Sequence, residues 1–494
     1  MLKPLAAIAV ALLAGSLPIR ANAELSESLY EYVAANTSAA EPVAEATTAT
    51  AKTEAPAADT SEEKAAAEAV EQAENAKSEQ PAERTEEKAG DEAQKKPESE
   101  NMDATPASSS APGINSCDSC SGQCGCGESC GCGDACGPGS SPYCCSSLEN
   151  LSLTKLLGVG CCLGWEVGGW TEAGYTNNNV PLSQAFDDLL SFQDLPDQLN
   201  LNQQWFYLGK KADGSCGTDW GFRVDMMYGT DAQKTQSFGN PNAGIRGEGA
   251  FDASWDNGYY GWAMPQLYGE VAMGDTTVKA GHFFTPLGYE VIPATGNFFY
   301  THSYTFFNSE PFTHTGVLAT NKSYDGLTLY GGWTLGWDTG YAQLNSGNNG
   351  IAGFTKEVND DTTFTYICTF GNFGWRDGGS KNSYQHSIVL DMKLTSNLEW
   401  VLQSDDLSTS NPNVSDFDTI GAVNYLFYKI NDKVKFGSRT EWWKADGVSF
   451  YEATLGPNIN LAKNFVVRPE WRQDWAPGIG LDEDTFGIDA ILTY

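Results

Sequence analysis

The feature that most constrains this fold is a strict two-residue alternation near the C-terminus, in NFVVRPEWRQDW, residues 464–475. One set of alternate residues holds the charged side chains Arg468, Glu470, Arg472 and Asp474, and the other holds the bulky ones, Phe465, Val467, Trp471 and Trp475. Successive side chains of a β-strand point to opposite sides of a sheet. The segment is therefore predicted to be a strand with one wet and one apolar face.

The same alternation recurs along the chain from Leu163 to the end, between turn residues. It predicts sixteen strands, at about 163–175, 201–209, 218–230, 259–272, 276–286, 313–321, 326–337, 350–357, 362–370, 384–394, 398–405, 417–429, 433–443, 450–461, 464–474 and 485–494. The segment 417–429 is ambiguous because aromatic residues occur on both of its faces. A soluble sandwich also alternates, so the period alone does not tell where the apolar faces point.

The connections between these strands separate a soluble sandwich from a membrane barrel. Counted back from Tyr494, long and short connections are expected to alternate throughout, with 444–449 among the long ones. An even strand number with short periplasmic turns and longer outer loops is typical of single-chain outer-membrane barrels. The fold class predicted is all-β: a closed antiparallel transmembrane β-barrel of about sixteen strands, occupying residues 163–494.

Both ends of the chain support export to a membrane. Met1 to Ala23 has a short basic start, an apolar stretch and a small-residue cleavage site, so residues 1–23 are predicted to be a signal peptide. No later run reaches the roughly 18 apolar residues that a membrane-spanning helix needs. The last strand ends on Phe486, Ile488, Ala490, Leu492 and Tyr494, an alternating stripe resembling the signal that barrel assembly machinery reads.

Residues 24–112 differ in composition from everything that follows. They contain 21 acidic and 7 basic residues and have little to bury, which predicts a disordered linker. The residues Leu25, Leu29 and Tyr32, and the segment 62–77, have helical character. Docking of these parts on a cell-wall or envelope partner is the alternative to a mobile spacer.

A Cys/Gly-rich segment, residues 113–162, follows the linker. Its candidates for disulfides or metal binding are Cys117, Cys120, Cys124, Cys126, Cys130, Cys132, Cys136, Cys144 and Cys145. Export favours disulfides, although neighbouring thiols close strained short loops and therefore favour longer or intermolecular bridges. Closely spaced thiolates also suit a soft metal, and a thiol-rich linker with neither role is a third reading.

The longest aromatic-rich loop lies between the predicted strands 276–286 and 313–321. With six Phe or Tyr residues between 298 and 307, it is expected to fold into the barrel and narrow it at about 286–313; a cap over the rim is the alternative. Its constriction candidates are Tyr289, Glu290, Asn297, His302 and Glu310. Residues 281–333 resemble the central signature of a β-barrel porin family described as OmpL-like, abundant in planctomycete-type bacteria. The resemblance covers about residues 162–494 and implies an outer-membrane pore without catalytic residues.

A sixteen-stranded barrel is wide enough for an aqueous channel for small hydrophilic solutes or ions. Residues 163–494 contain 39 acidic and 19 basic side chains, which favours cations. The predicted pore-lining residues are Arg223, Asp225, Arg439, Glu441, Arg468, Glu470, Arg472 and Asp474. Opposite charges on the wall give either a transverse field or paired struts without a transport role.

Three classes of function follow from this reading. A diffusion porin is the first, and a structural or adhesive envelope barrel cross-linked through its cysteines is the second. A hydrolase is disfavoured, because His282, His302, His314 and His386 lie in no recognisable nucleophile or metal motif. The partners expected are outer-membrane lipid, the barrel assembly machinery and, by analogy with porins, two further copies in a homotrimer; no cofactor, resident metal or nucleic acid is expected.

Overall fold

The computed structural model describes most of the chain beyond residue 163. The described residues are 152–157, 164–180, 192–193, 195–237, 251–252, 255–341, 343, 346–374, 382–410, 417–445 and 447–494. The predicted signal peptide, the acidic linker and the nine cysteine candidates between 117 and 145 lie outside this part of the chain.

Long antiparallel strands dominate the described residues. The first nine are β1 (Glu166–Thr176), β2 (Asn200–Lys210), β3 (Thr218–Gly229), β4 (Asp256–Asn257), β5 (Tyr260–Met273), β6 (Thr276–Phe284), β7 (Thr313–Tyr324), β8 (Leu327–Thr334) and β9 (Asn348–Asn359). The remainder are β10 (Thr362–Asn372), β11 (Ser383–Thr395), β12 (Leu398–Thr409), β13 (Phe417–Lys429), β14 (Val434–Ala445), β15 (Val448–Ala462), β16 (Phe465–Ala476) and β17 (Leu481–Thr493).

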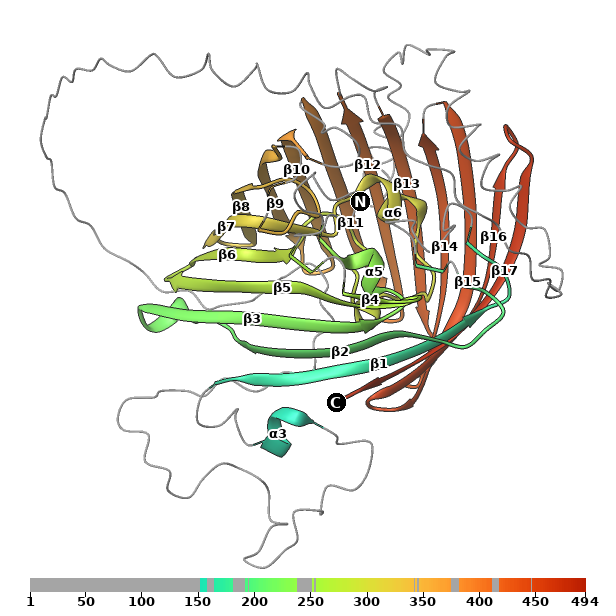
Figure 1. The fold of residues 1–494 in the computed structure, drawn as a ribbon, viewed down its shortest axis with the longest axis horizontal. Helices are drawn as coiled ribbons and strands as arrows, with labels where there is room; N and C mark the ends of the chain where they lie inside the picture. The colour runs from blue at the N-terminus through green and yellow to red at the C-terminus, as the bar shows by residue number, and fades with distance from the viewer. Residues whose placement is uncertain are drawn as a thin grey trace, which may run out of the picture. The chain divides into compact units, whose positions relative to one another are not determined.

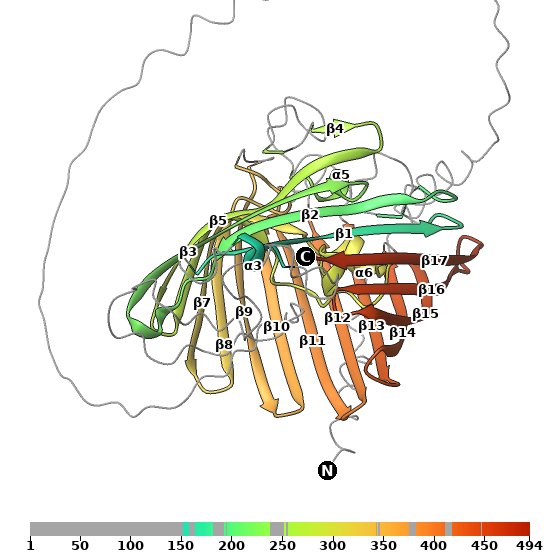
Figure 2. The same cartoon turned by 90° about the horizontal axis from the view of Figure 1, so that it is seen from below.

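These strands form a closed barrel (Figures 1 and 2). Apart from the two-residue β4, which pairs only with β5, each strand pairs antiparallel with the next, and β3 pairs directly with β5. The ring is closed by β1 and β17, where Trp170 lies opposite Thr493 and Gly169 exchanges backbone hydrogen bonds of 3.0 Å with Tyr494. The prediction of an all-β barrel of sixteen strands is confirmed.

Helical elements are few and short within the described residues. They are α3 (Leu153–Leu157), η2 (Gly214–Cys216), α5 (Ala232–Thr235), η4 (Ala294–Gly296) and α6 (Tyr304–Ser309). None of them has both the length and the apolar composition of a membrane-crossing helix.

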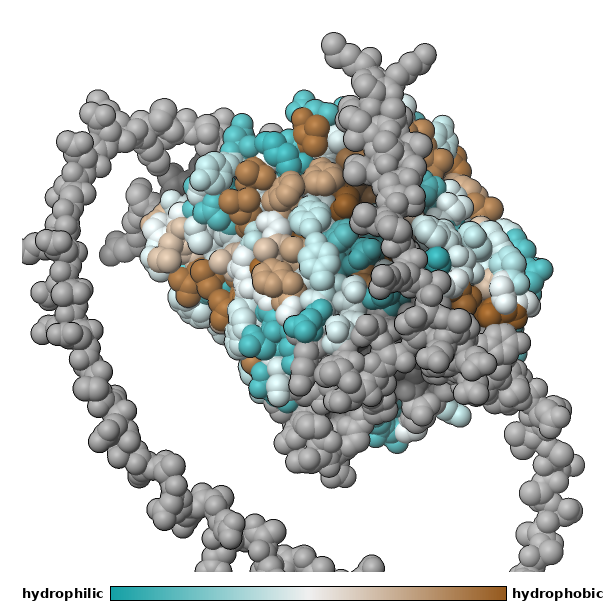
Figure 3. Space-filling model, turned by 90° about the horizontal axis from the view of Figure 1, so that it is seen from above, coloured by the Kyte–Doolittle hydropathy of each residue, from teal (hydrophilic) through white to brown (hydrophobic). Residues whose placement is uncertain are grey.

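The two faces of the strands differ as the alternation predicts. On β16, Trp471 is 40% exposed, whereas its neighbours Glu470 and Arg472 are 3% and 0% exposed. On β17, Phe486 is exposed while Asp489 on the opposite face is buried. Hydrophobic side chains occur on the outer surface of the molecule beside hydrophilic ones (Figure 3). The charged faces of these strands therefore point into the barrel, and the apolar faces point outward.

The expected alternation of long and short connections is not strict. The long connection predicted at 444–449 is wrong: β14 runs to Ala445 and β15 begins at Val448, so only two residues join them. Both strands extend past their predicted ends, and Gly447, with a φ of 93°, takes the backbone conformation that such a tight turn needs. The connection between β2 and β3, residues 211–217, stands where the alternation expects a short turn. It is longer than a tight turn because it contains η2.

The ambiguous segment 417–429 forms strand β13 with aromatic side chains on both faces. Tyr425 and Phe427 are buried inside the barrel, while Leu426 and Tyr428 are exposed outside. The inner rings contact aromatic side chains of the connection between β6 and β7, with 4.6 Å between the ring centres of Phe298 and Phe427. Both faces of β13 are apolar, because its inner face packs on these aromatic side chains and its outer face belongs to the apolar outer surface of the barrel.

Candidate functional site

The connection between β6 and β7, residues 285–312, is named here the inner loop. It lies within the ring of strands, where α6 is seen against β13 and β14 (Figure 1). Its helix α6 begins after Ser303, whose Oγ accepts a 3.2 Å hydrogen bond from the N–H of Phe306, as expected of an N-cap residue. Most of the side chains from residue 299 to residue 312 are buried.

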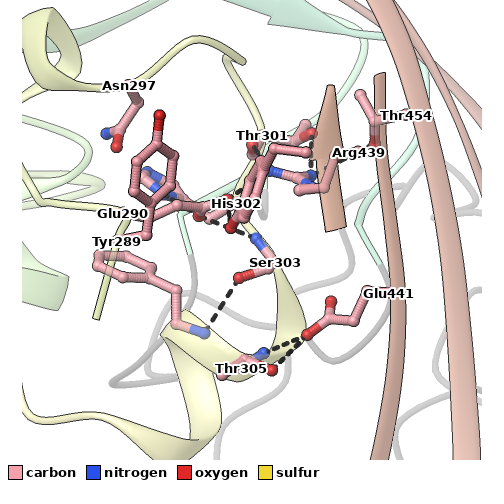
Figure 4. Close-up of polar contacts among 12 residues, drawn as sticks. Tyr289, Glu290, Asn297, Thr301, His302, Ser303, Thr305, Arg439, Glu441 and Thr454 are labelled. Carbon is pink, nitrogen blue, oxygen red and sulfur yellow. Dashed lines mark hydrogen bonds and ion pairs between the residues drawn. The ribbon is translucent and has the colours of Figure 1, made fainter. Parts of the chain in front are cut away.

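Arg439 on β14 is the first of three arginines that hold the inner loop. Its guanidinium contacts Glu290 of the loop and Glu452 of β15, each at 2.8 Å, and donates to the backbone oxygen of Thr301 at 2.7 Å (Figure 4). The side chain is 1% exposed, so these bonds form away from water. A buried guanidinium with several acceptors fixes the loop at a definite position on the wall.

Arg468 and Arg472 on β16 bind the loop through its backbone. Arg468 pairs with Asp489 at 2.5 Å and donates to the carbonyl oxygens of Ala294 and Asn297 at 3.0 and 2.8 Å. Arg472 pairs with Asp474 at 2.8 Å and donates to the carbonyl oxygen of His302 at 2.5 Å. Each arginine therefore joins a wall carboxylate to a turn of the loop.

Two wall carboxylates accept backbone N–H groups of the same loop. Glu470 accepts from Tyr300 and Thr301 at 2.8 and 3.1 Å. Glu441 accepts from Tyr304 and Thr305 at 2.6 and 2.7 Å, at the start of α6 (Figure 4). These contacts satisfy buried donors that have no partner within the loop.

Burial and these partners shift the pKa values of two ionisable side chains of the loop, Glu290 and His302. Burial alone would raise the pKa of Glu290, but Arg439 and His302 bind its carboxylate and hold the pKa at about 2. Burial lowers the pKa of His302 from its usual 6.5, despite the 2.9 Å contact with Glu290. The stability that Glu290 contributes is fully present above pH 4.5, its pKa in the unfolded chain, and is lost as the pH falls toward 2. Below pH 6.5, protonation of His302 in the unfolded chain lowers the stability of the folded state, in which His302 is buried. Acid therefore weakens this part of the anchoring.

Apolar packing surrounds the charged contacts. Towards β12, Phe306, Phe307 and Phe312 of the inner loop join a buried cluster with Phe192, Trp337, Phe373 and Leu407. Towards β11–β13, Tyr289, Phe298 and Phe299 pack on Val389, Val401, Val423, Tyr425 and Phe427. The inner loop thus contacts the wall through both apolar and ionic surfaces.

Inward-facing glycines leave room for loop side chains on the wall. A Cβ atom at Gly421 would lie 2.1 Å from Oγ1 of Thr305, one at Gly437 would lie 2.3 Å from the ring of Phe298, and one at Gly174 would lie 2.4 Å from the ring of Tyr300. Real contacts of that length do not occur, so the seated loop requires glycine at these three positions.

Replacing Gly421 by valine is therefore expected to displace Thr305 and loosen the loop, at a cost of about 1–3 kcal/mol from overpacking. The measurement is the urea midpoint of the folded protein in detergent. Gly331→Val is the matched control, because a Cβ there meets nothing within 4 Å on the exposed face of β8. Equal midpoints for the two variants would show that the loop does not depend on this contact.

The predicted wall residues separate into two groups. Arg439, Glu441, Arg468, Glu470, Arg472 and Asp474 are all buried; Asp474 accepts a 2.5 Å hydrogen bond from Tyr304, and the others contact the inner loop as described above. Arg223 and Asp225 pair with each other on β3, apart from the loop, and the Arg223 guanidinium lies 3.9 Å from the ring of Tyr207. Arg223 remains partly exposed.

The five loop candidates also occupy different environments. Glu290 and His302 contact each other at the arginine network, and Glu310 lies beside Gln403 of β12. Asn297 accepts the N–H of Val291 at 2.9 Å and so closes a turn of the loop. Tyr289 is partly buried and packs on Tyr425, with 4.9 Å between ring centres.

The four histidines do not form one cluster, although His282 and His314 are neighbours on β6 and β7. His282 contacts Ser237 and Thr315, His314 contacts Thr285, and His386 lies near Tyr366 and Tyr384 on β10 and β11. Among the described residues no group of three or more His, Cys, Asp or Glu side chains is arranged to hold a metal ion. Cys216 and Cys368 are free thiols in this part of the chain.

Four carboxylates of the site were not predicted from the sequence: Glu172, Asp405, Glu452 and Asp489. All are inward-facing and no more than 2% exposed. Glu452 and Asp489 stand on the polar faces of their strands, so the alternation alone was enough to place them on the wall. Their partners Arg439 and Arg468 depend on strand register, which the sequence does not give.

A closed ring of sixteen strands with apolar outer faces, a charged interior and an enclosed loop defines an outer-membrane β-barrel of the porin class. The chain belongs to the family described as "Putative beta-barrel porin-2, OmpL-like", whose model matches residues 164–492. It is an outer-membrane protein. No curated protein sequence matches the chain.

Several solved structures are similar to this barrel at low sequence identity. An anion-selective porin from Comamonas acidovorans is 10% identical, with 67% of this chain and 99% of that chain covered and a TM-score of 0.45. The outer membrane channel DcaP of Acinetobacter baumannii is 10% identical, with 67% and 97% covered and a TM-score of 0.45. In vitro folded OmpT, an outer membrane protein of Vibrio cholerae, is 10% identical, with 67% and 97% covered and a TM-score of 0.42.

Proposed function

We propose that this protein is a diffusion channel for small hydrophilic solutes or ions, narrowed by the inner loop, at about residues 286–313 as the sequence predicts. The observation that carries the proposal is the ionic attachment of an enclosed loop to the inner wall, through Arg439, Arg468 and Arg472. A loop fixed in this way sets the free cross-section at one level of the barrel. The partly exposed side chains of Tyr289 and Asn297 stand at that level.

The charge around the loop supports a preference for cations. The three arginines form ion pairs with five carboxylates: Glu172, Glu290, Glu452, Asp474 and Asp489. The barrel region as a whole is also acidic, with 39 acidic and 19 basic residues. A narrow passage with an excess of negative charge attracts cations and repels anions.

Recordings in planar lipid bilayers test the proposal. The purified full chain is expected to give stepwise conductance, and a KCl gradient is expected to give a reversal potential on the potassium side. The folded state is verified independently by the change in gel mobility on heating. A folded barrel that stays silent would contradict the channel, and a reversal potential on the chloride side would contradict the cation preference.

A second function is favoured by the packing of the C-terminal part of the inner loop, residues 306–312. Phe306, Phe307 and Phe312 are buried in one cluster with Trp337 and Phe373, as in the core of a soluble domain. A barrel filled in this way suits a structural or adhesive envelope protein, cross-linked by the cysteines of residues 113–162. Large thiol-sensitive oligomers on non-reducing gels, together with an absence of conductance, would support that function over transport.

The rest of the proposal concerns parts outside the described residues and partners. Residues 1–23 direct export, 24–112 form a disordered acidic linker and 113–162 a cysteine-rich segment ahead of the barrel. The alternating stripe that ends at Tyr494 is read by the barrel assembly machinery, and copies of the chain associate as a homotrimer. The protein has no enzymatic activity in this proposal.

A further inference from the structure

A pair of buried carboxyl groups joins the end of the inner loop to β12. Glu310, directly after α6, is 2% exposed, and Asp405 on the inner face of β12 is 0% exposed. Nε2 of Gln403 donates to both carboxyl groups, at 2.8 Å to Asp405. Gly288 leaves room for the pair, because a Cβ there would lie 1.9 Å from Oε2 of Glu310.

The two groups have different hydrogen-bond environments. Asp405 accepts from three side-chain donors: Gln403 at 2.8 Å, Gln385 at 2.9 Å and Ser387 at 2.9 Å. Among the described residues Glu310 accepts only from Gln403, and its buried Oε2 has no hydrogen-bond partner there. The three donors favour the ionised form of Asp405. Oε2 of Glu310 accepts no hydrogen bond and is therefore the oxygen atom that carries a proton in the neutral acid.

No cation compensates this pair within the described residues, since neither carboxyl group forms an ion pair there. The other charged group that acts on Glu310 is also acidic: Glu290 in the loop. Two adjacent buried carboxylates without a cation partner cannot both be ionised at low cost. One of them must keep its proton.

We propose that Glu310 is a neutral carboxylic acid that latches the inner loop to Asp405, and that loss of its proton releases this end of the loop. The latch is a property of the fold. Its consequence for transport, a channel that widens in alkaline solution, rests on the function proposed above.

The pH range follows from the sign of the shift. Burial, and then the charge of Asp405, raise the pKa of Glu310 well above the ordinary 4.5, so the latched state binds the proton more tightly than the released state. Each pH unit above the ordinary value and below the raised one then favours release tenfold. His302, with its lowered pKa, acts in the opposite direction only below about pH 6.5. The range from pH 7 to pH 9 therefore excludes the titration of His302, and comparison with a Glu310 variant separates Glu310 from other buried carboxyl groups.

Chymotrypsin cleavage of the folded full chain tests the latch without relying on conductance. Phe306 and Phe307 are 3% and 1% exposed, so the enzyme reaches them only when the loop leaves the wall. The cleavage rate of the wild-type protein, divided by that of Glu310→Gln at the same pH, is expected to rise with pH, by at most about tenfold per pH unit. The glutamine variant keeps a neutral donor at this position. Because both rates are measured at the same pH, their ratio does not depend on the pH profile of chymotrypsin itself.

Asp405→Asn is the second variant, because it removes the repulsion from Asp405 while Glu310 stays buried, and it should diminish the rise. A constant ratio between wild type and Glu310→Gln from pH 7 to 9 would overturn the proposal, as would an undiminished rise in Asp405→Asn. Planar bilayers then separate the two proposals. A protein that shows the cleavage pattern but no conductance has the latch without the channel.

Discussion

Removal of residues 289–311, replaced by a short Gly/Ser turn between β6 and β7, is expected to raise the single-channel conductance several-fold and to weaken ion selectivity. The reason is geometric: the inner loop occupies the interior, and the wall that it covers carries Arg439, Glu441 and Glu470. Without the loop, water reaches these side chains and the free cross-section approaches that of an open sixteen-stranded barrel. Conductance steps in planar bilayers, with reversal potentials in a salt gradient, measure both effects.

The shortened protein must be shown to fold before its conductance is interpreted. Strand content by circular dichroism and the heat-dependent gel mobility should match those of the full chain, because residues 289–311 contribute no strand. Asn308→Ala, a partly exposed position within α6, is the control in which the loop is altered but retained. Unchanged conductance after the deletion would mean that the loop does not limit flow.

Replacement of Arg439 by methionine is expected to cost about 3–5 kcal/mol of unfolding free energy, as found when one partner of a buried ion pair is removed. Glu290 and Glu452 would be left facing each other without the guanidinium that now binds both at 2.8 Å. Equilibrium unfolding in urea, followed by tryptophan fluorescence in lipid vesicles, gives the difference.

Lys435→Met is the matched control for this measurement. Lys435 lies on the same face of β14 as Arg439, four residues away, but its side chain is exposed. Its replacement should change the unfolding free energy by less than about 0.5 kcal/mol, as is usual for exposed sites. Similar losses for the two variants would show that the arginine network adds nothing particular to stability.

The strands of this barrel were predictable because each carries its own pattern. On β16, Glu470 and Arg472 face inward while Trp471 faces out, and membrane outside with charge inside is sufficient to produce that order. Trp443 is an apolar residue on the otherwise polar inner face of β14. It is buried against Tyr304 and Phe450 and does not lie at a membrane interface.

What the sequence did not provide depends on contacts between distant parts of the chain. Arg439 meets Glu290 across 149 positions, and Arg468 meets Glu172 across 296, so neither partner leaves a local pattern. The helix α6 escaped prediction because a six-residue segment of aromatic and β-branched residues has weak helical preference and is stabilised by the wall. The inner loop could be expected from its aromatics, and Glu441 and Glu470 from the alternation, but not the hydrogen bonds that join these carboxylates to the loop.

Closure of the ring between β1 and β17 joins residues more than 310 positions apart, and the contact of Tyr494 with Trp170 spans 324. During biosynthesis the first strand therefore waits for the last, and an incomplete chain presents two unpaired edges to any neighbour. Unpaired edges template intermolecular pairing, and contacts this far apart in sequence form slowly. A chain that ends before residue 481 would lack β17, leave β1 and β16 as unpaired edges and be prone to aggregate.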